Sequence, residues 1–169
     1  SHDWDFEGLP GSDVKLRSEW LPRLAPLYKG ENPLMYAKTV KRLRFVFIDN
    51  STYEILPEQL DFFRKELASG QLVILVCHIP LYTPARDVFS CGNPGWNAAN
   101  DPYWQIERRQ RWPEKGPSET TKAFCQEAFS SANLIGILAG HTHDFTIDVY
   151  RGKVQLVCGG FKRTISLTV

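Results

Sequence analysis

Three of the four histidines in the chain stand just after apolar segments that are typical of buried strands. His78 follows the run 72–77, and His141 and His143 follow the run 134–139. Ligand sites in open α/β sheets gather at the carboxyl ends of strands, so we expect these imidazoles to share one end of a sheet. Imidazole binds zinc, iron, nickel and copper, and it tolerates manganese. One histidine in such a place is usually a packed residue, whereas three favour a metal site.

The spacing of His141 and His143 suits a shared site. Residues i and i+2 of an extended segment point to the same side, so both imidazoles can reach one ion or two neighbouring ions. Gly140 lets the backbone turn beside them. A structural zinc is the competing interpretation, but such sites usually recruit closely spaced cysteines. Cys77, the neighbour of His78, should face the other side of its strand.

The elements that must position these residues follow from the apolar pattern. Short apolar or β-branched runs predict strands, and a Gly-containing turn at 151–153 predicts a hairpin. Pro57 suits the first position of a helix, and Ser118 suits an N-cap. We expect strands at 43–48, 72–77, 134–139, 145–150, 154–158 and 164–169, helices at 12–20, 57–68 and 120–130, and an otherwise irregular segment from 1 to about 40. Alternating strands and helices predict a layered α/β fold.

The segment 83–118 is rich in proline and tryptophan and predicts an ordered insertion, with a short helix around 103–111. Its tryptophans either cap a pocket and stack a base or sugar, or simply pack. Tyr82 and Arg86, on the loop that leaves the strand before His78, are either substrate contacts or ordinary loop residues.

From Leu43 onward the chain resembles the calcineurin-like metallophosphoesterase family. The resemblance rests on the strand that ends in Cys77-His78-Ile79-Pro80 and the strand that ends in Gly140-His141-Thr142-His143. It implies an α/β/β/α sandwich and two-metal hydrolysis of phosphate monoesters or diesters, with manganese, iron or zinc as the ions. His78 and His141 would ligate one metal and His143 the other. His2 of the dipeptide His2-Asp3 resembles the histidine of the family's Gly-Asn-His-Asp motif and would be the catalytic residue.

The start of the chain departs from the family pattern. Ser1 stands where the family has asparagine, and the upstream Asp-x-His and Gly-Asp motifs do not precede it. We therefore expect the C-terminal part of a single domain, truncated at the N-terminus, with partial or no metal occupancy. Missing strands would expose apolar surface and favour self-association. A non-catalytic binding module on a phosphoesterase-like scaffold is the alternative.

Composition argues against nucleic acids and membranes as binding partners. The 169 residues suit one domain, and a formal net charge of +1 gives no broad footprint for nucleic acid or an anionic membrane. No apolar run approaches the ~20 residues of a membrane span. The four cysteines lie far apart, which favours a reducing compartment, and we expect a cytoplasmic protein.

Overall fold

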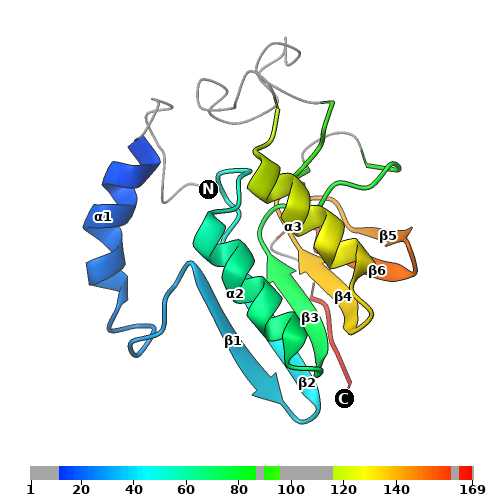
Figure 1. Cartoon of the computed structure of the whole chain (residues 1–169), viewed down its shortest axis with the longest axis horizontal. Helices are drawn as coiled ribbons and strands as arrows, with labels where there is room; N and C mark the ends of the chain where they lie inside the picture. The colour runs from blue at the N-terminus through cyan, green and yellow to red at the C-terminus, as the bar shows by residue number, and fades with distance from the viewer. Residues whose placement is uncertain (1–11, 87–89, 96–115, 161–163, 169) are drawn as a thin grey trace.

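A computed structural model describes residues 12–86, 90–95, 116–160 and 164–168 of the chain. Within these residues three helices accompany one six-stranded sheet, so the fold is mixed α/β as predicted (Figure 1). The helices are α1 (Ser12–Leu24), α2 (Pro57–Ala68) and α3 (Glu119–Ser130). The strands are β1 (Met35–Val40), β2 (Leu43–Ile48), β3 (Leu72–Cys77), β4 (Leu134–Ala139), β5 (Thr146–Tyr150) and β6 (Lys153–Val157).

Parallel strands occupy the middle of the sheet, whose order is β1-β2-β3-β4-β6-β5. β2, β3, β4 and β6 pair in parallel, and the antiparallel strands β1 and β5 form the two edges. Because parallel strands run in one direction, the chain leaves β2, β3 and β4 at the same end of the sheet. The loops that follow these three strands therefore meet there.

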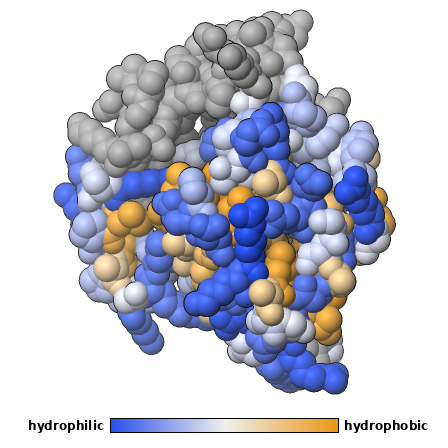
Figure 2. All heavy atoms as spheres, in the orientation of Figure 1, coloured by the Kyte–Doolittle hydropathy of each residue, from blue (hydrophilic) through white to orange (hydrophobic). Residues whose placement is uncertain are grey.

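Helices α2 and α3 lie on one face of the sheet and cover the hydrophobic core (Figure 1). Phe63 of α2 and Phe124 of α3 are both fully buried, and their ring centroids are 4.6 Å apart. Burial of each ring contributes about 2 kcal/mol to folding. Seen from this side, hydrophilic side chains cover most of the two helices, and hydrophobic ones show between them (Figure 2).

The opposite face of the sheet is apolar, and we call it the open sheet face. Side chains alternate along a strand, so the neighbours of the core residues point to this face. Ile147 and Val149 of β5 are 58% and 70% exposed there. The exposed apolar side chains on this face come from β1, β3, β5 and β6, and they are Val40, Leu72, Ile147, Val149 and Val154.

Most of the predicted elements are confirmed. The bounds of β2, β3, β4 and α2 match the predicted ranges, and α1 continues four residues past its predicted end at Trp20. Ser118 caps α3, since its side chain accepts a hydrogen bond from the N–H of Thr121 at 3.2 Å. The hairpin of β5 and β6 turns at Arg151 and Gly152, which both have a positive φ.

Two predictions are wrong. Residues 35–40 are not irregular, because they form β1 and pair along their whole length with β2. Residues 164–168 form no strand, since no neighbouring strand pairs with them. The helix predicted at 103–111 lies outside the described residues. Among the described helices, none combines the length and the apolar character that crossing a bilayer requires.

Candidate metal centre

A buried asparagine joins the loop after β2 to the end of β3. Asn50 is fully buried, and its Oδ1 accepts hydrogen bonds from the backbone N–H groups of His78, at 3.0 Å, and Ile79, at 2.9 Å. Its Nδ2 donates to the carbonyl of Ile79 at 2.7 Å. Such a satisfied buried amide holds its partners in one arrangement. The backbone at His78 is therefore fixed against the loop at residues 49–56.

His78 and His141 meet where the adjacent strands β3 and β4 end. His78 Nε2 lies 3.2 Å from His141 Nδ1, and the ring centroids are 5.0 Å apart with 74° between the ring planes. The N–H of Gly140 donates to the carbonyl of His78 at 2.9 Å, which continues the contact between the two strands beyond their last residues. The fold thus brings together two of the three predicted metal ligands from positions 63 residues apart.

The distance between these two nitrogens fits two ligands of one ion. With metal–nitrogen bonds of about 2.0–2.1 Å, neighbouring ligands of a tetrahedral or octahedral ion lie about 2.9–3.4 Å apart. Imidazole also matches the ions that the sequence predicts. Among the described residues, however, no group of three or more His, Cys, Asp and Glu side chains is placed to hold an ion. The described residues therefore do not gather a complete coordination shell.

His143 stands apart from the imidazole pair. His141 and His143 have φ of 72° and 60°, so the backbone after β4 bends through left-handed conformations and is not extended. The alternation expected of residues i and i+2 in a strand does not apply to such a bend. His143 is exposed, and within the described residues no hydrogen bond or ring contact links it to His78 or His141. Its assignment to a second metal stays a prediction.

Gly159 makes room for this bend. A Cβ atom at this position would lie 2.6 Å from the backbone nitrogen of Phe145 and 2.9 Å from the carbonyl carbon of Asp144. Both distances are shorter than any ordinary contact, and both neighbours are backbone atoms that cannot rotate away. The path of the chain after His143 therefore depends on glycine at position 159.

Tyr53 is a site residue that the sequence reasoning missed. Its hydroxyl oxygen lies 2.7 Å from His141 Nε2, and its ring meets the imidazole edge-on, with centroids 5.5 Å apart and planes at 83°. The side chain is only 3% exposed. Tyr53 lies in a short loop with no hydrophobic periodicity, so the sequence carries no signal that it faces a histidine 88 positions away.

Two buried thiols lie near the site but face the core. Cys77 is 8% exposed and belongs to the hydrophobic core, as its position beside His78 predicts. Burial raises the pKa of the Cys77 thiol above its usual range. The pKa of the Cys91 thiol is raised mainly by a hydrogen bond with Cys125, and burial raises it further. Both side chains are therefore neutral thiols at pH 7, and both belong to the hydrophobic core.

The other candidate residues have mixed outcomes. Arg86 contacts Asp148 at 2.8 Å and also bonds to Thr146, and the side chains of Arg86 and Asp148 are only 11% and 12% exposed. This largely buried ion pair anchors the loop after His78 to β5, which gives Arg86 a structural role in that loop. His2 and the tryptophans of the insertion lie outside the described residues.

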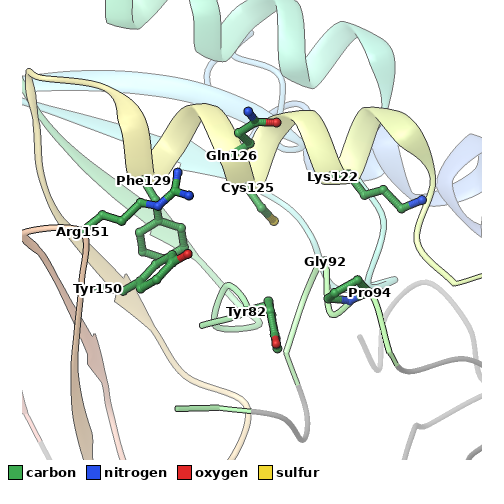
Figure 3. Close-up of a pocket in the computed structure, with 9 residues that line it drawn as sticks. All are labelled: Tyr82, Gly92, Pro94, Lys122, Cys125, Gln126, Phe129, Tyr150 and Arg151. Atoms are coloured by element: carbon green, nitrogen blue, oxygen red, sulfur yellow. The ribbon is translucent and has the colours of Figure 1, made fainter. Parts of the chain in front are cut away.

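Tyr82 lines a separate cavity of about 240 Å³ beneath α3 (Figure 3). The cavity lies between α3, the end of the β5–β6 hairpin and the segment around Gly92 and Pro94. Aromatic rings form part of its wall, and Phe129 meets Tyr150 edge-on at 5.0 Å. None of His78, His141 and His143 lines this cavity. It is therefore distinct from the candidate metal centre.

Comparison with known proteins shows distant likenesses to solved structures. Neither the scan against known protein families nor the search of curated proteins finds a match. Among solved structures, GAP50, the anchor in the inner membrane complex of Plasmodium, matches with 14% identity and a TM-score of 0.41, over 74% of this chain and 36% of that one. A candidate 5′-nucleotidase from Staphylococcus aureus, solved with alpha-ketoglutarate, matches with 8% identity and a TM-score of 0.37, over 74% and 23% of the two chains. This chain thus spans 36% and 23% of the lengths of these two structures.

Proposed function

We propose that this chain contributes metal ligands to a metal-dependent phosphoesterase that hydrolyses phosphate monoesters or diesters. The observation that carries the proposal is the approach of His78 Nε2 to His141 Nδ1, at 3.2 Å, where β3 and β4 end. The order of the sequence motifs around these two histidines supports the same class of reaction. His143, one residue beyond Thr142 on the same bend, is the proposed ligand of a second ion.

The proposed role of the described residues is mainly to provide metal ligands and to fix the positions of those ligands. His78 and His141 would hold one ion, through Nε2 and Nδ1 respectively. A bound divalent ion at such a site supplies charge stabilisation to the phosphate oxygens and lowers the pKa of a water molecule that attacks phosphorus. Asn50 fixes the backbone of His78, and the hydrogen bond between Gly140 and His78 fixes the start of the bend. The two imidazoles are therefore pre-organised for binding an ion.

Hydrolysis of p-nitrophenyl phosphate and bis-p-nitrophenyl phosphate tests this proposal. The assay uses the longest natural form of the protein, loaded with Mn²⁺, Fe²⁺ or Zn²⁺. The double variant His78→Ala/His141→Ala should lose at least about 100-fold in kcat/KM, because it removes both ligands of one ion. The double variant Glu58→Ala/Lys65→Ala, on the exposed side of α2, is the matched control and should keep full activity. Equal activity of the histidine variant and the wild type would contradict the proposal.

A second candidate function is a binding module without catalysis. It is favoured by the small number of grouped ligands, since the described residues gather fewer than three side chains that could hold an ion. Under this alternative the assay above detects no hydrolysis with any of the three ions, while the wild type still folds cooperatively. Hydrolysis that depends on His78 and His141 would exclude it.

A further inference from the structure

We infer that Tyr53 is a positioning residue that holds the imidazole of His141 with Nδ1 turned towards His78. The inference rests on the proposed function, since it concerns the same metal centre. The atom that carries it is the Tyr53 hydroxyl oxygen, which lies 2.7 Å from His141 Nε2. Both ring nitrogens of His141 therefore have a fixed neighbour, Tyr53 at one and His78 at the other.

Tyr53 is itself held firmly. Its φ is +65°, a left-handed conformation that bulky aromatic residues rarely adopt. Its backbone N–H donates to the carbonyl of Asn50 at 2.9 Å, and its carbonyl accepts a hydrogen bond from the thiol of Cys91 at 3.4 Å. Unusual backbone conformations persist where the surroundings enforce them, and they cluster at functional sites. Here the enforced conformation directs the hydroxyl at the imidazole.

The same loop also fixes His78. Asn50 bonds to the backbone at His78 and Ile79, and Gln59 of α2 donates to the carbonyl of Asp49 at 2.7 Å. One rigid segment therefore positions both imidazoles, His78 through its backbone and His141 through its ring. This arrangement explains why a tyrosine far from either histidine in sequence belongs to the site.

The hydroxyl can accept the proton of the His141 tautomer that binds a metal through Nδ1. A neutral imidazole carries one N–H, and the nitrogen without it is the one that binds a metal. When His141 offers Nδ1 to an ion, its proton must sit on Nε2, where the Tyr53 oxygen lies at the right distance to accept it. Hydrogen bonds of this kind fix the ring and raise the basicity of the ligating nitrogen. A phenylalanine at position 53 would keep the ring packing but lose this effect.

Calorimetric titration of the longest natural form of the protein, the form used in the hydrolysis assay, with ZnCl₂ alone tests the inference. Tyr53→Phe should weaken Zn²⁺ binding by about 10- to 100-fold, the range typical of lost hydrogen bonds to metal-ligating histidines. Tyr82→Phe is the matched control, because it removes a hydroxyl at the separate cavity beneath α3 and should bind Zn²⁺ as the wild type does. Equal Zn²⁺ affinity of Tyr53→Phe and the wild type would overturn the inference.

Nitrogen-15 NMR of the imidazoles gives a second readout that does not depend on hydrolysis. In the Zn²⁺-bound wild type, the proton of His141 should reside on Nε2 and show a through-space contact with the Tyr53 ring. A proton on Nδ1 would overturn the inference even where the Tyr53→Phe variant fails to fold. If Zn²⁺ binding by the wild type does not depend on His78, the proposed function itself is wrong. This outcome separates failure of the proposed function from failure of the inference about Tyr53.

Discussion

At the scale of single residues, Gly159 decides whether the chain can bend after His143. The added methyl group of Gly159→Ala would lie 2.6 Å from the nitrogen of Phe145, so the backbone must shift. We expect a loss of about 1–3 kcal/mol in the free energy of unfolding, measured by urea titration. Gly95→Ala is the matched control, because its nearest neighbour is the Asn93 side chain at 3.6 Å, an ordinary contact. Equal stabilities of the two variants would contradict this account of Gly159.

Asn50 gives a second prediction at this scale. Asn50→Ala leaves the buried N–H of Ile79 and that of His78 without their acceptor, and it removes the donor to the carbonyl of Ile79. Unsatisfied buried groups of this kind cost about 1–3 kcal/mol each, so we expect a loss of about 2–4 kcal/mol in thermal or urea unfolding. Asn32→Ala, which removes one bond at an exposed loop, should lose less than about 1 kcal/mol.

The buried thiol of Cys91 predicts a dependence of stability on pH. Its pKa is raised in the folded state by the hydrogen bond with Cys125 and by burial, from an ordinary value of 9.0. The unfolded chain therefore loses this proton at a lower pH than the folded chain does. The contribution of this thiol to stability should be constant below about pH 8 and should fall above pH 9, by up to about 1.4 kcal/mol per pH unit. Melting curves from pH 7 to 10 measure this, and Cys91→Ala should show a shallower decline.

At the scale of elements, the predictable parts are those with strong local signals. The β2, β3 and β4 segments are short apolar runs that end at polar residues, and α2 begins at Pro57 with a clear apolar stripe. β1 lacks such a signal, because its turn to β2 at Lys41 and Arg42 contains no glycine and its outer residues are polar or exposed. The approach of His78 and His141 at the ends of β3 and β4 could be predicted from these signals. Tyr53 and the bend at His143 did not, because they depend on long-range contacts and on left-handed backbone.

Gln155 of β6 ties the loop after His78 to the sheet. Its fully buried amide accepts a hydrogen bond from the N–H of Leu81 at 2.8 Å and donates to the carbonyl of Leu81 at 3.0 Å. Gln155→Leu keeps the volume but leaves both groups of Leu81 unsatisfied, so we expect a loss of about 2–4 kcal/mol. Hydrogen exchange at the Leu81 amide should accelerate more than at the sheet amides. Unchanged exchange at Leu81 would show that the loop does not depend on Gln155.

At the scale of the whole molecule, the open sheet face has the character of an interaction surface. Ile147 and Val149 are more than half exposed on this face, and contiguous apolar surface of this kind usually marks an interface. We propose that this chain self-associates through the open sheet face, as the sequence also predicts. Sedimentation velocity should show concentration-dependent dimers or larger species. Ile147→Lys/Val149→Lys should shift the chain towards monomer, whereas a wild type that stays monomeric at every concentration would contradict the proposal.

The contact between His78 and His141 also offers a way to measure when β3 and β4 pair during folding. The two residues are 63 positions apart and approach only when β3 and β4 have paired, so an ion that bridges them stabilises every state in which that pairing exists. Zn²⁺ or Ni²⁺ added during refolding should therefore accelerate folding if the pair forms before the rate-limiting barrier. The same ions should only slow unfolding if the pair forms after it. The imidazole pair is thus a natural probe of when the centre of the sheet is built.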